Sequence, residues 1–220
     1  MVNNNKHVFW QALVVALIIF WSGILIGIFF EDSRVAELKS FYSDSETEIA
    51  DFNLASSMIF DKGLSCDVLN KEARIFTDRI YKEAIKLEDY DNANKLTDRV
   101  ISLHRKYDLL RTIIWKKIID NKAACNETID TLVYLYEYKN DQIGALSTQR
   151  TMANYITEVK KERGDDLILI PIATDMGILS LDLLLDDYGI SGNTTILINE
   201  KYVINDLNGL ADIRKDLDKD

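Results

Sequence analysis

The chain has 220 residues, 47% of them hydrophobic and 28% charged, and a formal net charge of −10 at pH 7. This acidic balance argues against nucleic-acid binding, because a surface that follows phosphates needs clustered lysine and arginine. With His7 and His104 as its two histidines, the sequence offers no zinc-ligand set and no base for a catalytic triad. We therefore predict no metal site and no cofactor.

Residues 8–30, VFWQALVVALIIFWSGILIGIFF, contain no charged side chain. As a helix they measure about 34 Å, which is enough to cross a hydrocarbon core of about 30 Å. A cleaved signal peptide would need a basic start, a shorter apolar run and a small-residue cleavage site, all of which are missing here. We therefore predict an uncleaved transmembrane helix over residues 8–30, held in the lipid bilayer.

The direction in which the chain crosses the membrane depends on several weaker signals. The positive-inside rule is nearly silent, because Lys6 precedes the span and Arg34 and Lys39 follow it. The short N-terminal flank, two cysteines able to pair and N-glycosylation patterns starting at Asn126 and Asn193 favour an outside location for the bulk of the chain. We predict a single-pass protein of the cell membrane, with a cytoplasmic N-terminus and an extracytoplasmic remainder.

Gly23 and Gly27 form a small-xxx-small pattern within the predicted span. Small residues at this spacing let two helix backbones approach closely, so a homodimer through these glycines is one option. Glycines are also common in membrane spans without any such role. Both alternatives stay open.

Residues 31–125 have helical periodicity and predict a helical stalk followed by a hairpin. A weak heptad pattern continues the first helix as far as Gly63, and it needs a partner, either the next two helices or a second copy of the chain. Residues 65–88 and the apolar stripe from Leu96 to Ile118 predict two further helices, with a break at LEDYDNAN, residues 87–94. Long helices joined by a short polar turn fold back as an antiparallel hairpin.

Cys66 opens the second of these predicted helices and Cys125 closes the third. An antiparallel hairpin brings both cysteines to the same end, which is the proximity that a disulfide requires. The alternative is a pair of buried free thiols in a reducing compartment. The disulfide is the favoured reading if this part of the chain lies outside the cytoplasm.

From residue 128 onward the pattern changes to strands that alternate with helices. Near-continuous apolar strands indicate a sheet covered on both faces. The predicted strands are 132–138, 167–173, 195–198 and 202–204, and the predicted helices are 147–164, 179–189 and 207–217. Tyr134, Tyr136 and Tyr138 share one face of the first strand, where they belong either to the core or to a binding surface.

Residues 129–220 resemble a thioredoxin-like domain. The most specific stretch runs from Leu181 to Gly209: an apolar helix ending in Asp-Tyr-Gly-Ile, then Thr194-Thr195, an apolar strand and a glycine. The whole chain also resembles small single-pass archaeal membrane proteins with an anchor, a two-cysteine helical hairpin and a thioredoxin-like domain. This second resemblance rests on Tyr107, Leu109, Leu110, Arg111, Trp115 and Cys125.

The resemblance implies an α/β fold class. It places the transmembrane helix at 8–30, a helical hairpin or coiled-coil segment at 31–125 and, at 128–220, a thioredoxin-like three-layer domain with a four-stranded mixed sheet. Relatives that act on disulfides carry Cys-x-x-Cys after the first strand, where the following helix lowers the pKa of the first thiol. In this chain that place holds Gln142, Ile143, Gly144 and Ala145.

Thr194 stands where such relatives have a cis-proline, and we expect a trans bond there because a cis bond before a residue other than proline costs about 3–4 kcal/mol. The departures predict a redox-inactive domain that is not an enzyme. Its expected function is to bind or scaffold an unknown protein partner. The alternative is a thiol-disulfide exchange factor that uses Cys66 and Cys125 with a partner protein.

Overall fold

The computed structural model describes residues 5–62, 66–92, 98–125, 129–140, 142–191 and 194–218. The chain is a mixed α/β protein that begins with a long apolar helix and carries a four-stranded mixed sheet, as predicted. It divides into two compact units, residues 1–44 and 45–220. Both glycosylation patterns begin at residues outside the described ones.

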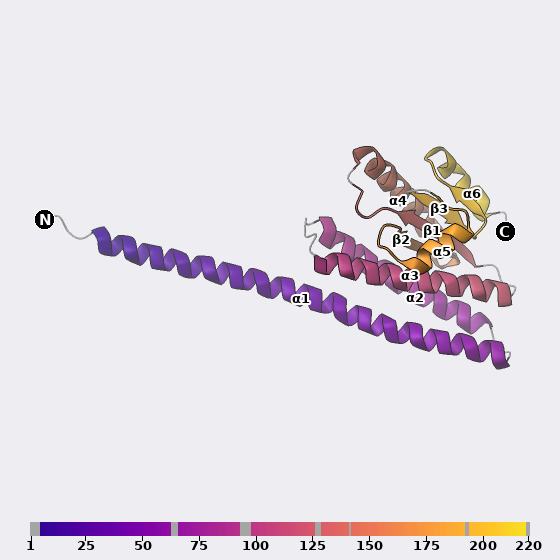
Figure 1. Ribbon diagram of the computed structural model, residues 1–220, viewed down its shortest axis with the longest axis horizontal. Coiled ribbons are helices and arrows are strands. Elements are labelled where there is room, and N and C mark those ends of the chain that lie inside the picture. Colours follow the sequence, from indigo (N-terminus) through magenta and orange to yellow (C-terminus); the bar gives the residue numbers. More distant parts are fainter. Residues whose placement is uncertain are drawn as a thin grey trace. The chain divides into compact units, whose positions relative to one another are not determined.

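The first helix, α1, runs from Asn5 to Lys62 (Figure 1). Within it, His7–Phe30 has a mean hydropathy of 2.8 and is long and apolar enough to cross a membrane. None of this stretch is buried against protein, so it is not a core helix of either unit. A β-carbon built on Gly23 or Gly27 would meet nothing within 4 Å, which leaves that face of the helix open.

Two amphipathic helices, α2 (Cys66–Asn92) and α3 (Asp98–Cys125), pack side by side (Figure 1). The helix was expected to break at residues 87–94, but α2 continues through Asn92, so the predicted start of the break is wrong. No glycine or proline interrupts residues 87–92, so nothing in the backbone chemistry stops the helix there. The remainder of that stretch lies outside the described residues. The apolar stripes are buried as predicted, at Ala73, Phe76, Ile80, Leu103, Tyr107, Leu110, Ile114 and Ile118.

Part of the weak heptad pattern in the C-terminal half of α1 packs against the helical hairpin. Ile49 is buried, and Glu48 forms an ion pair with Arg79 of α2. Part of the partner is therefore the helical hairpin of the same chain. Most other side chains of this pattern lie outside those described, and a coiled coil with a second copy stays a prediction.

The sheet has the strand order β2-β1-β3-β4. Strand β1 (Asp130–Tyr136) is parallel to β2 (Leu167–Ala173) and antiparallel to β3 (Thr195–Ile198), which pairs antiparallel with β4 (Tyr202–Ile204). Helix α4 (Ile143–Arg163) connects β1 to β2 through a short 3₁₀ turn, and α5 (Leu179–Asp187) precedes β3. A second 3₁₀ turn (Asn208–Ala211) and α6 (Asp212–Leu217) end the fold.

Two predicted boundaries next to the first strand are wrong by several residues. Strand β1 ends at Tyr136, not at residue 138, because the backbone N–H groups of Tyr138 and Lys139 donate to the Asp175 carboxylate and turn the chain out of the sheet. Helix α4 begins at Ile143, four residues before the expected start at 147. The predicted degenerate positions are therefore the first turn of a helix, not a loop.

Alternate residues of the strands face two different sets of helices. One face packs against α4 and α6 in a single apolar cluster. Its members are Leu132, Tyr134, Met152, Ile156, Val159, Leu167, Leu169, Ile196, Ile198, Ile204, Leu210, Ile213 and Leu217. The other face meets α3, where Lys122 Nζ donates to Thr131 Oγ1 at 2.9 Å. Figure 1 shows α4 and α6 on the side of the sheet opposite to α2 and α3.

The helical hairpin also covers the free edge of β2, which contacts α2 and α3. Thr174 N–H donates to Tyr136 O, so the N–H of Ala173 points away from β1. This N–H acts on the carboxylate of Asp108 in α3, whose pKa it lowers. Pro171 occupies the same outward register, where its missing N–H costs no ladder bond. An exposed strand edge invites pairing with another chain, and the hairpin prevents this.

The β3–β4 turn connects the sheet to α3 through Glu200. Asn199 and Glu200 have φ values of 49° and 57°, a left-handed conformation that is uncommon for glutamate. The Glu200 carboxylate accepts hydrogen bonds from Trp115 Nε1, Lys122 Nζ and Thr131 Oγ1 at 2.8–3.1 Å. These three bonds hold the strained turn in place.

Candidate functional site

The predicted degenerate positions lie at the carboxyl end of β1. Gln142 is the N-cap residue of α4, and its carbonyl accepts the N–H of Leu146 at 3.0 Å. Ile143 is 85% exposed, the highest value for a large apolar side chain in the described residues, whereas Ala145 is half-buried. Within the described residues, no side chain caps this helix end, so the first-turn N–H groups are open to an outside acceptor.

Gln149 lies one helical turn after Ala145 in α4 and contacts Thr194. Thr194 Oγ1 lies 3.3 Å from Gln149 Oε1, which also accepts the backbone N–H of Glu137 at 2.9 Å. Thr194 therefore lies beside α4, while its preceding peptide bond begins at Asn193, outside the described residues. Neither Gln149 nor Asp175 was singled out from the sequence, because their roles depend on contacts between segments distant along the chain.

The parallel strands β1 and β2 have their carboxyl ends on the same side of the sheet, and hydrogen bonds connect the loops that follow them. The carboxylate of Asp175, after β2, accepts the N–H groups of Tyr138 and Lys139, after β1, at 2.8 and 2.7 Å. Gln142 N–H is itself held by Asn140 Oδ1 at 2.9 Å. These bonds tie the described residues of the β1–α4 connection to Asp175 and to one another, next to the exposed Ile143.

Cys66 is half-buried and disulfide-bonded in the structure. The other cysteine of the chain is Cys125, whose side chain lies outside those described. The pairing of Cys66 with Cys125 therefore stays a prediction. No third cysteine exists in the sequence, so the edge around Ile143 and Thr194 contains no thiol.

A buried polar cluster lies on the face of α3 next to its apolar stripe. Arg111 Nη1 contacts Asp108 Oδ1 at 2.7 Å, and the two residues are 2% and 0% exposed. Burial raises the pKa of Asp108, and the charges of Arg111 and His104 together with the Ala173 N–H partly oppose that rise. Within the described residues, Arg111 Nε has no hydrogen-bond partner.

This cluster was not predicted from the sequence, although the spacing of its residues is a signal for it. His104, Asp108, Arg111 and Trp115 recur at helical spacing beside the apolar stripe, and Trp115 is fully buried. A large aromatic residue off the main stripe indicates that a helix buries a second face. The polar residues that share this face are then buried as well.

A cavity of about 240 Å³ lies between the hairpin and α4. Its lining includes Tyr134, Tyr136 and Tyr138, the tyrosines predicted for one strand face. Tyr134 and Tyr136 stack with ring centroids 5.6 Å apart, and Tyr138 lies on His104 at 4.2 Å. The tyrosines are thus partly core and partly the wall of a cavity.

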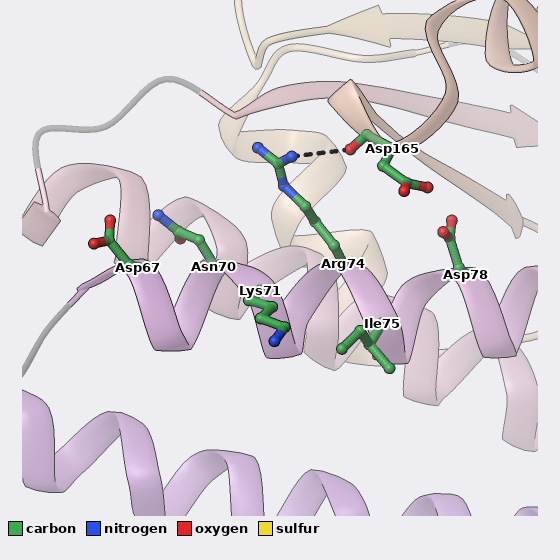
Figure 2. Close-up of a pocket in the computed structure, with 7 residues that line it drawn as sticks. All are labelled: Asp67, Asn70, Lys71, Arg74, Ile75, Asp78 and Asp165. Atoms are coloured by element: carbon green, nitrogen blue, oxygen red, sulfur yellow. Dashed lines mark hydrogen bonds between the residues drawn. The ribbon is translucent and has the colours of Figure 1, made fainter.

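A second hollow, of about 460 Å³, follows α2 and is open to solvent (Figure 2). In Figure 2 Arg74 points toward Asp165, to whose carbonyl oxygen its Nη1 donates at 3.1 Å. Asp78 is paired with Lys160 at 2.9 Å. Because these charges already have partners within the protein, the hollow resembles an ordinary polar surface more than a binding site.

No protein-family model matches the chain, and no curated protein or solved structure matches it either. Within the described residues, no group of three or more His, Cys, Asp or Glu side chains is placed to hold a metal ion. The described residues present an exposed apolar side chain, Ile143, near the carboxyl ends of β1 and β2, and an aromatic cavity.

Proposed function

We propose that the chain is a membrane-anchored, redox-inactive thioredoxin-like protein whose C-terminal domain binds a partner protein outside the cytoplasm. The strand order β2-β1-β3-β4, with one parallel and two antiparallel pairings, supports a thioredoxin-like assignment for residues 129–220. The apolar stretch His7–Phe30 supports the anchor.

The observation that carries the binding proposal is the exposure of Ile143 on a rigid helix start. Leu179, which is 73% exposed, begins α5 at the same edge of the sheet. An apolar side chain of the partner can cover Ile143. A backbone carbonyl or a carboxylate of the same partner can then accept the first N–H groups of α4. The partner chemistry is therefore an extended peptide segment with an apolar residue next to a hydrogen-bond acceptor.

A photo-reactive phenylalanine analogue at position 143 of the full membrane-bound chain should cross-link to one discrete protein. The yield should exceed that of the same analogue at Val203 by at least about tenfold, because Val203 is exposed on β4, away from this edge. Asp175→Ala releases the loop that supports Ile143 and should reduce the adduct. Asp187→Ala, at an exposed position of α5, serves as the matched control. Equal yields at 143 and 203 would refute the proposed surface.

Orientation has its own test. Protease added to intact cells that express the full chain should remove the region after the span, because we place that region outside. As a control for protease activity, cells opened with detergent should lose the same region and also their cytoplasmic proteins. Full protection before detergent would overturn the orientation and weaken the case for a disulfide.

The alternative function is thiol-disulfide exchange through Cys66 and Cys125 with a partner protein. Exchange requires a thiolate that reaches a disulfide sulfur, so it requires exposed and reducible cysteines. Cys66 is half-buried, which keeps this alternative open. The reduction experiment described in the Discussion separates a structural bridge from a reactive one.

A further inference from the structure

We infer that the cavity between the α2–α3 hairpin and α4 is a binding site for a small aromatic carboxylate. Five elements contribute to its wall: α2, α3, β1, β2 and α4. The lining residues are Tyr81, Ile85, His104, Arg111, Tyr134, Tyr136, Tyr138, Gln149, Arg150, Ala153, Ile156, Thr157, Leu169 and Pro171. This site is separate from the exposed edge at Ile143, although Gln149 belongs to both.

The size and the walls of the cavity favour one aromatic ring. A cavity of about 150 Å³ holds a benzene molecule, so about 240 Å³ has room for a ring and one small substituent. The Tyr134 and Tyr136 rings line the cavity and stack on each other, with an interplanar angle of 16°. Tyr134 is held in place because its hydroxyl donates to Gln149 O at 2.8 Å. Aromatic rings prefer such offset or edge contacts with one another.

The charge of the cavity favours an anion. Arg111 and Arg150 belong to the lining, whereas the described lining residues include no aspartate or glutamate, in a chain whose net charge is −10. Asp108 pairs with Arg111 Nη1 and leaves Nε as a buried donor without a hydrogen-bond partner in the described residues. Because Nε has almost no accessible surface, a ligand carboxylate would meet Arg111 where this residue lines the cavity, together with Arg150 at the entrance.

The cavity has an entrance on the solvent side. Ile85 of α2 and Arg150 of α4 line it and are both exposed, whereas Arg111 and Ile156 are buried. A ligand would therefore enter between α2 and α4, with its carboxylate toward Arg111 and its ring against the tyrosines.

The test uses the purified full chain in detergent, titrated with benzoate and 4-hydroxybenzoate and followed by ligand-observed NMR. The neutral isostere benzamide and the non-aromatic anion acetate serve as ligand controls. We expect benzoate to bind at least about tenfold more tightly than either control. Comparable affinity for benzamide or acetate would overturn the inference. The absence of benzoate binding at concentrations up to about 10 mM would overturn it as well.

Two variants locate the binding. Ala153→Leu fills the cavity from α4 and should weaken benzoate binding at least about tenfold. Ala123→Leu, at an exposed position of α3, makes the same change outside the cavity and should leave affinity unaltered. Should Ala153→Leu fail to fold by circular dichroism, the paired variant Asp108→Asn/Arg111→Met replaces it, because it removes the donor without leaving a buried charge. Undiminished binding by whichever of the two variants folds would refute the site.

Discussion

Replacing Arg111 by methionine should lower the free energy of unfolding by about 3–5 kcal/mol, because it leaves the carboxylate of Asp108 buried without its counter-charge. Urea unfolding of the full chain in detergent, followed by circular dichroism, measures this loss. The loss should shrink at about pH 4. Burial raises the pKa of Asp108, and a protonated carboxyl needs no counter-charge, so the penalty applies above the folded-state pKa.

Two controls separate this effect from a general sensitivity of α3. The paired variant Asp108→Asn/Arg111→Met removes both charges and retains an acceptor for the Ala173 N–H, so it should be more stable than Arg111→Met alone. Lys116→Met breaks the exposed ion pair with Asp120 on the same helix and should cost about 0–1 kcal/mol. A loss from Arg111→Met no larger than that from Lys116→Met would contradict the buried pair as a source of stability.

Reduction of the predicted Cys66–Cys125 bridge should lower the free energy of unfolding by roughly 4 kcal/mol, the chain-entropy value for a closed loop of about 60 residues. For a chain of this size the midpoint of thermal unfolding should fall by about 8–16 °C. Thermal unfolding with and without a strong reductant measures the shift, and mass spectrometry of the non-reduced protein should find the two peptides linked.

The Cys66→Ser/Cys125→Ser variant should unfold like the reduced protein and should not respond to reductant. Two alkylatable thiols in protein isolated without reductant would contradict the bridge. The same experiment bears on function. A structural bridge should resist a glutathione buffer, whereas rapid reduction by glutathione would favour thiol-disulfide exchange over the binding role that we propose.

Periodicity alone predicted the elements whose character is local. The apolar stretch within residues 8–30 is recognisable because length and hydrophobicity by themselves decide whether a helix can span a membrane. The apolar stripes of α2 and α3 and the four strands followed from the spacing of buried side chains. The turn at Asn199-Glu200 falls between two predicted strands, 195–198 and 202–204, but the three bonds that stabilise Glu200 come from α3 and β1.

Element boundaries were less predictable, because they depend on partners that are distant in sequence. The end of β1 at Tyr136 follows from Asp175, which lies 36–37 residues beyond the two N–H groups that it accepts and that would otherwise extend the strand. Side-chain periodicity carries no information on such a bond. Residues 142–145 therefore form the N-cap and first turn of α4, ahead of the helix start that was predicted at residue 147.

Sequence by itself determined the apolar helix, the helical stripes, the succession of strands and helices along the chain and the absence of a thiol pair from residues 126–220, since each depends on residue type and local spacing. Tertiary structure decided that the hairpin covers the edge of β2 and buries Asp108 with Arg111. It also decided that the tyrosines, Gln149 and α4 enclose a cavity. These features arise where segments far apart in sequence meet, and the packing geometry at such a contact is not encoded in the periodicity of either segment.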